Sequence, residues 1–104
     1  MLRYYFTFLL LLSISSTAAP LSPPQLNIEF TGFQANLAWT NTVDATDYTL
    51  FYAPYPEMQP INQLNMKSEQ QLSVNLQMGD AYYIAIQANN ATETSDYSNI
   101  EHIR

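Results

Sequence analysis

Residues 76–90 read Leu76-Gln-Met-Gly-Asp-Ala-Tyr-Tyr-Ile-Ala-Ile-Gln-Ala-Asn-Asn90, and this stretch decides the fold of the chain. Within it, Tyr82, Ile84, Ile86 and Ala88 occupy every second position. A period of two is typical of a β-strand with one buried face and one partly wet face. The stretch therefore predicts a central strand in one sheet of a packed pair, preceded by a turn at Gly79-Asp80.

The same period occurs in three other parts of the chain. Leu72, Val74 and Leu76 alternate just before the turn, and residues 37–39 (Leu-Ala-Trp) and 48–52 (Tyr-Thr-Leu-Phe-Tyr) alternate earlier. Each of these runs has the length and pattern of a short strand with one apolar face. Together they indicate an all-β domain.

These pieces resemble the fibronectin type III family. The six-residue spacing from Leu76 to Tyr82 is similar to the tyrosine corner of that family, in which the phenol bonds back to upstream backbone. Residues 37–39 and 48–52 look like its second and third strands, and residues 95–99 look like the entry to its last strand. The resemblance covers roughly residues 24 to 104. It implies an immunoglobulin-like β-sandwich of about seven antiparallel strands. One departure is that the loop at 90–94 lacks the glycine often found there.

The alternation also predicts which side chains face inward, and Trp39 is expected to be the most costly of them to lose. The predicted inward set comprises Leu26, Ile28, Phe30, Leu37, Trp39, Tyr48, Leu50, Tyr52, Leu72, Val74, Leu76, Tyr82, Ile84, Ile86 and Ala88. The chain has no cysteine, so we expect its stability to come from packing rather than from disulfides.

The first residues have the features of a secretory signal peptide. Arg3 is followed by an apolar stretch that is too short to span a bilayer, and small residues precede Pro20. Cleavage after Ala18 is predicted, because cleavage after Ala19 would place Pro20 directly behind the cut. The alternative is an uncleaved anchor. The predicted organisation is a signal peptide at 1–18, a stiff Pro-rich lead-in at 19–24 that acts as a tether, and a fibronectin type III-like domain at 25–104.

The charge of the chain restricts its partners. The formal net charge is −6, with nine acidic residues and three basic ones. Duplex nucleic acids and anionic membranes are therefore poor partners, because both are bound largely through lysine and arginine. We expect a secreted, periplasmic or extracellular protein that does not insert into a membrane once the signal peptide is removed.

The inventory of reactive groups argues against an enzyme. A thiol nucleophile is absent, and a serine–histidine–carboxylate arrangement would have to use His102, the only histidine, close to the end of the chain. Asp44 and Asp47 are too few for a calcium site and are expected to shape the turn before the strand at 48–52. We therefore predict no catalytic residue, no metal and no cofactor.

Two segments are ambiguous in the sequence. Residues 61–67 fit either a short edge strand or an irregular crossover. Ile100 and Ile103 are three positions apart, so both cannot face the core from one regular strand. A bulge or early fraying is therefore expected in the final strand.

The candidate contact residues lie in two loops. Tyr55 stands between Pro54 and Pro56 with Met58 close by, and rigid aromatic side chains are common anchors of protein interfaces. The alternative is that Tyr55 folds back over the sheet edge as a local plug. The second candidate is the polar loop at 89–96, in which Asn90, Thr92 and Glu93 are the expected partner-binding residues. Asn90-Ala-Thr92 also matches the N-glycosylation pattern.

Two functions of different classes are compatible with these residues. The first is a non-catalytic exported module that recognises a protein or a glycan through its loops or an edge strand. The second is a structural spacer or self-assembling surface component that acts through exposed edge strands. A glycan-binding accessory role finds less support, because the chain offers no row of tryptophans for stacking on sugars.

Overall fold

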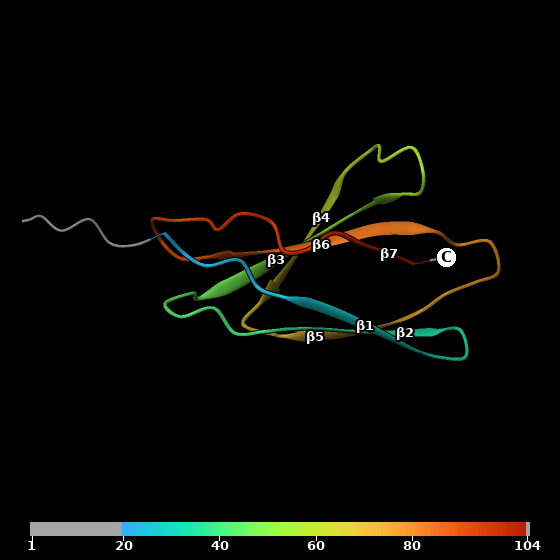
Figure 1. Ribbon diagram of the computed structural model, residues 1–104, viewed down its shortest axis with the longest axis horizontal. Coiled ribbons are helices and arrows are strands. Elements are labelled where there is room, and N and C mark those ends of the chain that lie inside the picture. Colours follow the sequence, from blue (N-terminus) through green and yellow to red (C-terminus); the bar gives the residue numbers. More distant parts are fainter. Residues whose placement is uncertain (1–19, 104) are drawn as a thin grey trace, which may run out of the picture.

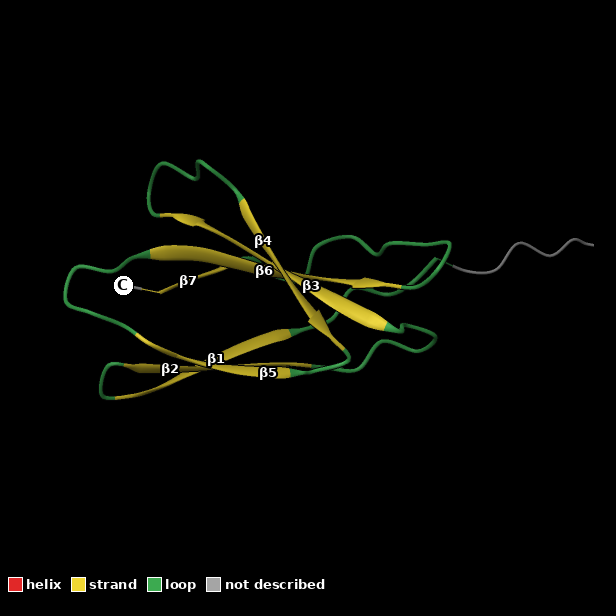
Figure 2. Ribbon diagram, turned by 180° about the vertical axis from the view of Figure 1, so that it is seen from behind, coloured by secondary structure: helices red, strands yellow, loops and turns green. Residues whose placement is uncertain are grey.

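The computed structural model describes residues 20–103, which form a β-sandwich with no helix in this range (Figure 1). The strands are β1 (Leu26–Thr31), β2 (Gln34–Trp39), β3 (Asp47–Pro54), β4 (Asn62–Lys67), β5 (Gln71–Asn75), β6 (Tyr82–Asn89) and β7 (Glu101–Ile103). They form a three-stranded sheet in the order β1-β2-β5 and a four-stranded sheet in the order β4-β3-β6-β7. Figure 2 shows the two sheets as separate layers. The predicted seven-stranded antiparallel sandwich is confirmed, whereas the predicted signal peptide lies outside the described residues.

The molecule has two poles, which are defined by the pairing of β3 with β6. This ladder runs antiparallel from Asp47↔Asn89 at one end to Pro54↔Tyr82 at the other. The loops 40–46 and 90–94 therefore lie at one end, here called the N-terminal pole, where the described chain also begins (Figure 1). The loops 55–61 and 76–81 and the β1–β2 turn lie at the opposite C-terminal pole.

The core lies between the sheets and contains most of the predicted inward residues. Trp39 is only 4% exposed, and its ring packs edge-on against Tyr48 with 6.3 Å between centroids. Its Nε1 atom is buried without a hydrogen-bond partner. The core members are Leu21, Leu26, Ala35, Leu37, Trp39, Tyr48, Leu50, Met66, Ile84, Ile86, Ala88 and Ile103.

Two of the predicted inward residues are wrong. Phe30 is 52% exposed and Tyr52 is 37% exposed. Phe30 lies beside the β1–β2 turn at the C-terminal pole, where the opposite sheet does not reach over it. Tyr52 lies at the same end of β3, and its ring packs edge-on against Tyr82 rather than into the core. Leu72, Val74 and Leu76 are half-buried at the margin of the core.

The lead-in packs onto the sandwich instead of standing off as a tether. Residues 20–24 have no regular secondary structure, yet the side chains of Leu21 and Pro24 are buried. The Thr42 hydroxyl donates a hydrogen bond of 2.8 Å to the carbonyl of Ser22. The apolar Leu21 thus joins the core and holds this extended segment against the domain.

The turn before β6 is closed differently from the predicted tyrosine corner. The Gln77 N–H donates to Oδ2 of Asp80 at 2.7 Å, and the Asp80 N–H donates to the Gln77 carbonyl at 3.0 Å. The Tyr82 hydroxyl makes no hydrogen bond to any part of the chain that the structure describes. The predicted hydrogen bond from the Tyr82 phenol to upstream backbone is therefore wrong. The turn is closed instead by the hydrogen bonds between Gln77 and Asp80.

Two buried serines, which precede β7 in the chain, bond to the part of β6 that β7 does not reach. The Ser95 N–H donates to the Ala88 carbonyl at 2.8 Å, while the Ala88 N–H donates to the Ser95 hydroxyl at 2.9 Å. Ser98 repeats this arrangement with Ile86, at 2.8 and 2.9 Å. Each hydroxyl in turn donates to the carbonyl of the next residue. These two residues, here called the serine pair, satisfy the backbone hydrogen-bonding groups of Ile86 and Ala88, which β7 does not reach.

The two ambiguous segments are resolved. The segment 61–67 contains the edge strand β4, which pairs with β3 across a register shift at Tyr48/Thr49. The last strand is short, with Ile103 2% exposed and Ile100 55% exposed, so the expectation that only one of them faces the core is confirmed.

Candidate functional site

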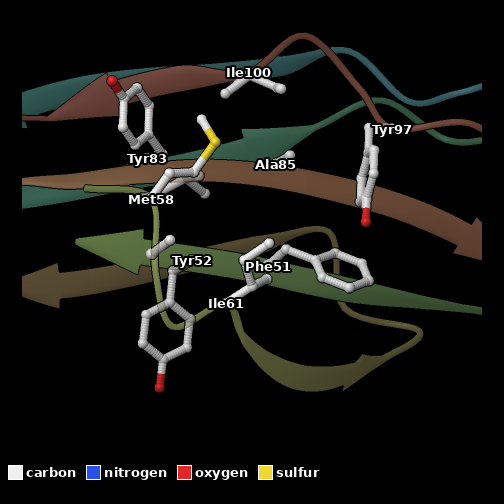
Figure 3. Close-up of a pocket in the computed structure, with 10 residues that line it drawn as sticks. Phe51, Tyr52, Met58, Ile61, Tyr83, Ala85, Tyr97 and Ile100 are labelled. Atoms are coloured by element: carbon white, nitrogen blue, oxygen red, sulfur yellow. The ribbon is translucent and has the colours of Figure 1, made fainter. Parts of the chain in front are cut away.

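The outer face of the four-stranded sheet carries an apolar hollow of about 110 Å³, here called the outer groove. Figure 3 shows Met58 and Tyr83 on one side of it and Phe51 and Tyr97 on the other. Strand β3 supplies Phe51 and β6 supplies Tyr83, while the loop 55–61 and the segment before β7 supply the rest. The side chains that surround the hollow are Phe51, Met58, Ile61, Tyr83, Tyr97 and Ile100.

The hollow arises because small residues alternate with large ones on this face. Ala53 and Ala85 point outward from β3 and β6 and are only 3% and 6% exposed, so they form the floor. Phe51 lies opposite Ala85 in the β3–β6 ladder. Its ring stands perpendicular to that of Tyr97, with 5.0 Å between centroids. Large rings beside two alanines therefore produce walls around a shallow floor.

Tyr55 forms part of an aromatic cluster next to the outer groove. Its ring stacks on His102 with centroids 5.3 Å apart and an interplanar angle of 17°. It also lies 5.1 Å from the ring of Tyr83, which lines the groove. This placement corresponds to the alternative in which Tyr55 folds back over the sheet, and its contact with a partner stays a prediction.

Met58 is part of the outer groove itself. It is 39% exposed and adopts a φ of 61°, and its N–H donates to the Pro54 carbonyl at 2.8 Å. This bond closes the loop that projects from the sandwich at the C-terminal pole (Figure 1). Its role as a contact residue stays a prediction, but its position is compatible with one.

Asn90, Thr92 and Glu93 lie at the N-terminal pole, away from Met58. The Asn90 Oδ1 atom accepts from the N–H groups of Thr92 and Glu93 at 3.0 and 2.8 Å, and its Nδ2 donates to the Asp44 carbonyl at 3.1 Å. Asn90 thus shapes the loop that lacks the expected glycine. Because β3 separates the poles by roughly 20 Å at about 3.3 Å per residue, the five predicted contact residues do not form one site.

The outer groove has the composition of an interface core. None of the residues that line it is charged, and tyrosine, phenylalanine, methionine and isoleucine make up its walls. The cores of protein interfaces are depleted in charge and enriched in aromatic residues and methionine. The neighbouring outward positions on β3, β4 and β6 are the uncharged polar residues Thr49, Gln63 and Gln87. An apolar centre with a polar border is therefore present on this face.

Sequence reasoning missed most of this groove. Phe51 and Tyr83 occupy outward positions that the alternation marks as solvent-exposed, and Tyr97 lies outside the alternating runs. The available signal was a break in the pattern, since Leu50-Phe51-Tyr52 and Tyr82-Tyr83-Ile84 are large at three successive positions. A strand with large side chains on both of its faces is expected to make apolar contacts on both.

No protein-family profile matches the chain, and no curated protein matches it either. Among solved structures, the fn3 domain of human collagen alpha-1(XX) chain superposes with a TM-score of 0.66 at 22% identity, over 88% of this chain and 91% of that one. The chain has the fibronectin type III fold.

Two further structures share this fibronectin type III fold. The chicken CNTN1 FN1–FN3 domains match with a TM-score of 0.67 at 15% identity, over 93% of this chain and 32% of that one. The twitchin kinase region of C. elegans matches with a TM-score of 0.64 at 16% identity, over 80% of this chain and 16% of that one. Fibronectin type III domains are typically non-catalytic.

Between residues 20 and 103, no helix is long and apolar enough to cross a membrane. In the same range, no three histidine or acidic side chains come together as possible metal ligands.

Proposed function

We propose that this domain is a non-catalytic, exported recognition module that binds a protein partner through the outer groove. The observation that carries the proposal is an uncharged, tyrosine-lined hollow on the central strands of a sheet, whose walls Ile61, Tyr97 and Ile100 are about half exposed to solvent. Exposed apolar patches on monomeric domains mark interaction sites more often than chance placement. The fibronectin type III fold supports the module class, and the apolar segment before Ala18 supports export.

The chemistry of the groove and its surroundings restricts the partner. The hollow suits one apolar side chain, which would lie against the rings of Phe51 and Tyr83. Lys67 is the only lysine or arginine among residues 20–103, whereas all nine acidic residues lie in this range. A partner that carries a net positive charge and presents an apolar anchor is therefore favoured by charge complementarity with the domain as a whole.

A second candidate function is self-association through an edge strand, which would make the domain a spacer or assembly unit. Strand β4 forms one edge of the four-stranded sheet and pairs only with β3. Its Leu64 side chain is 44% exposed. An uncovered edge with an apolar side chain can pair with another copy of the chain.

Affinity capture from the native secretome, followed by binding measurements on matched variants, tests the first function. Ile61→Ser and Tyr97→Ala remove exposed walls of the groove, and we expect each to weaken the captured interaction by about 30-fold, which corresponds to about 2 kcal/mol at an interface hot spot. Val43→Ser makes the same kind of change at the N-terminal pole, where Val43 is 76% exposed. This control should bind as the wild type does. The affinity of Tyr55→Ala for the same partner is measured alongside, and its far-UV spectrum shows whether the variant is folded. An unchanged affinity would exclude Tyr55 as an anchor of the interface.

Three outcomes would contradict the groove assignment. If both groove variants bind as the wild type does, the outer groove is not the binding site. If only Asn90→Ala or Glu93→Ala loses binding, the binding site lies at the N-terminal pole. Absence of a partner together with concentration-dependent self-association would favour the assembly function.

A further inference from the structure

A second hollow, of about 320 Å³, lies between the two sheets and is here called the inter-sheet cleft. It lies beside β4 and β5, which diverge from their connecting turn toward the C-terminal pole (Figures 1 and 2). Its floor consists of core residues, among them Leu37, Leu50 and Ile84. Its walls toward solvent include Leu64, which is 44% exposed, and the half-buried Leu72 and Val74.

The cleft opens to solvent beside Leu64, and its volume exceeds that of the voids in a close-packed interior. Protein interiors are close-packed, and their voids are seldom larger than a water molecule. An engineered apolar cavity of roughly 150 Å³ in another protein stays dry and binds benzene. At the N-terminal pole, Trp39, Tyr48 and Met66 fill the space between the sheets, whereas the side chains that line the cleft are mainly aliphatic, together with Tyr52 and Tyr82. The space between the sheets is therefore less completely filled where β4 and β5 separate.

Two residues of the cleft lining, Asp80 and Tyr82, carry polar groups that can meet a ligand. The Asp80 carboxylate lines it and uses Oδ2 to accept from the Gln77 N–H. Its Oδ1 atom accepts no hydrogen bond from residues 20–103. The Tyr82 hydroxyl, which belongs to another residue of the lining, is likewise without a partner in that range. No lysine or arginine lines the cleft. This part of the wall thus offers hydrogen-bond acceptors and one negative charge beside an apolar interior.

We propose that the inter-sheet cleft binds a small apolar molecule with a protonated amino group, whose chain lies between the sheets and whose ammonium group meets Asp80 and Tyr82. Ligand sites are typically apolar hollows of roughly 300–1,000 Å³ with a few convergent polar groups. The volume accommodates on the order of ten non-hydrogen atoms, at about 30 Å³ for each atom the size of a water. Asp80 selects a cation and disfavours a carboxylate. This site lies on the opposite face of the four-stranded sheet from the outer groove, with Tyr52 and Ile84 in the lining of both, and it does not depend on the proposed function.

Titration of the purified chain with octylamine tests the proposal, with the methyl resonances of Leu50, Ile84 and Val74 as the readout. We expect saturable shifts in these methyl groups and an affinity at least tenfold higher than that for octanoate or butylamine. Octanoate has a similar chain with the opposite charge, and butylamine has the same charge with a shorter chain. Asp80→Asn keeps an oxygen for the Gln77 N–H, and it should reduce octylamine affinity to that of octanol.

Two variants test the location of the bound chain. Val74→Trp fills the cleft and should abolish octylamine binding, whereas Gln71→Trp, on the opposite face of β5, should leave it unchanged. Leu64→Trp covers the cleft from an exposed position and serves if Val74→Trp does not fold. The proposal would be overturned if Val74→Trp and Leu64→Trp bound octylamine as tightly as the wild type does. It would also be overturned by equal affinities for octylamine and butylamine, or by methyl shifts that depend only on protein concentration.

Discussion

Replacement of Trp39 by alanine is expected to lower the free energy of unfolding by about 3–5 kcal/mol. The indole is 4% exposed between the two sheets and packs against Tyr48, so its loss leaves a cavity that neighbouring side chains cannot fill. A domain of this size has a net stability of about 5–15 kcal/mol. The variant should therefore be marginally folded, which urea denaturation followed by far-UV circular dichroism will measure.

Trp39→Phe is the matched control, because it keeps an aromatic ring in the core and removes the buried N–H group. The Trp39 Nε1 atom has no hydrogen-bond partner, and an unsatisfied buried donor costs about 1–3 kcal/mol. Removal of this unsatisfied N–H group offsets part of the packing energy that Trp39→Phe loses. We therefore expect Trp39→Phe to be destabilised by less than half as much as Trp39→Ala. Equal destabilisation by the two variants would show that the buried N–H group is not a liability in solution.

Simultaneous replacement of the serine pair by alanine is expected to cost about 2–6 kcal/mol, since each change leaves one buried N–H of β6 without an acceptor at about 1–3 kcal/mol. The Ile86 N–H donates to Ser98 and the Ala88 N–H donates to Ser95, both at 2.9 Å in buried surroundings. Chemical denaturation measures the total loss. Hydrogen exchange should show faster exchange at these two amides than at the rest of β6.

Ser73→Ala provides the control for the serine pair. The Ser73 hydroxyl donates to the Asn36 side chain at 2.8 Å, but this bond is exposed to solvent. Its loss should change stability by less than about 0.5 kcal/mol, as for most surface substitutions. A double serine variant that is no less stable than Ser73→Ala would contradict the role given to the serine pair.

The alternation in residues 82–88 was sufficient to predict β6 and its central place in a sheet, because the period of a strand follows directly from burial on one face. The same reasoning placed Trp39 in the core. It failed at Phe30 and Tyr52, since alternation identifies the face of a strand but not how far the opposite sheet extends along it. Their exposure depends on where β4 and β5 separate at the C-terminal pole.

The candidate site could be predicted only in part. Loop composition predicts Met58 as a contact residue, and Met58 lies in the outer groove. Phe51 escapes prediction because alternation marks its strand face as solvent-exposed, and Tyr97 does so because it lies outside the alternating runs. The same kind of loop argument predicts Asn90, which lies at the other pole. The role of the serine pair depends on hydrogen bonds to backbone groups of another strand, which no local pattern contains.

The two ends of the described chain leave the molecule at opposite poles, and this has a mechanical consequence (Figure 1). Tension along the long axis slides β1 along β2 and β7 along β6, and the ladder hydrogen bonds lie perpendicular to the pull and share the load. Strand β1 has six register pairs with β2, whereas β7 has three with β6. Under force, the sandwich should therefore begin to yield at its carboxyl end.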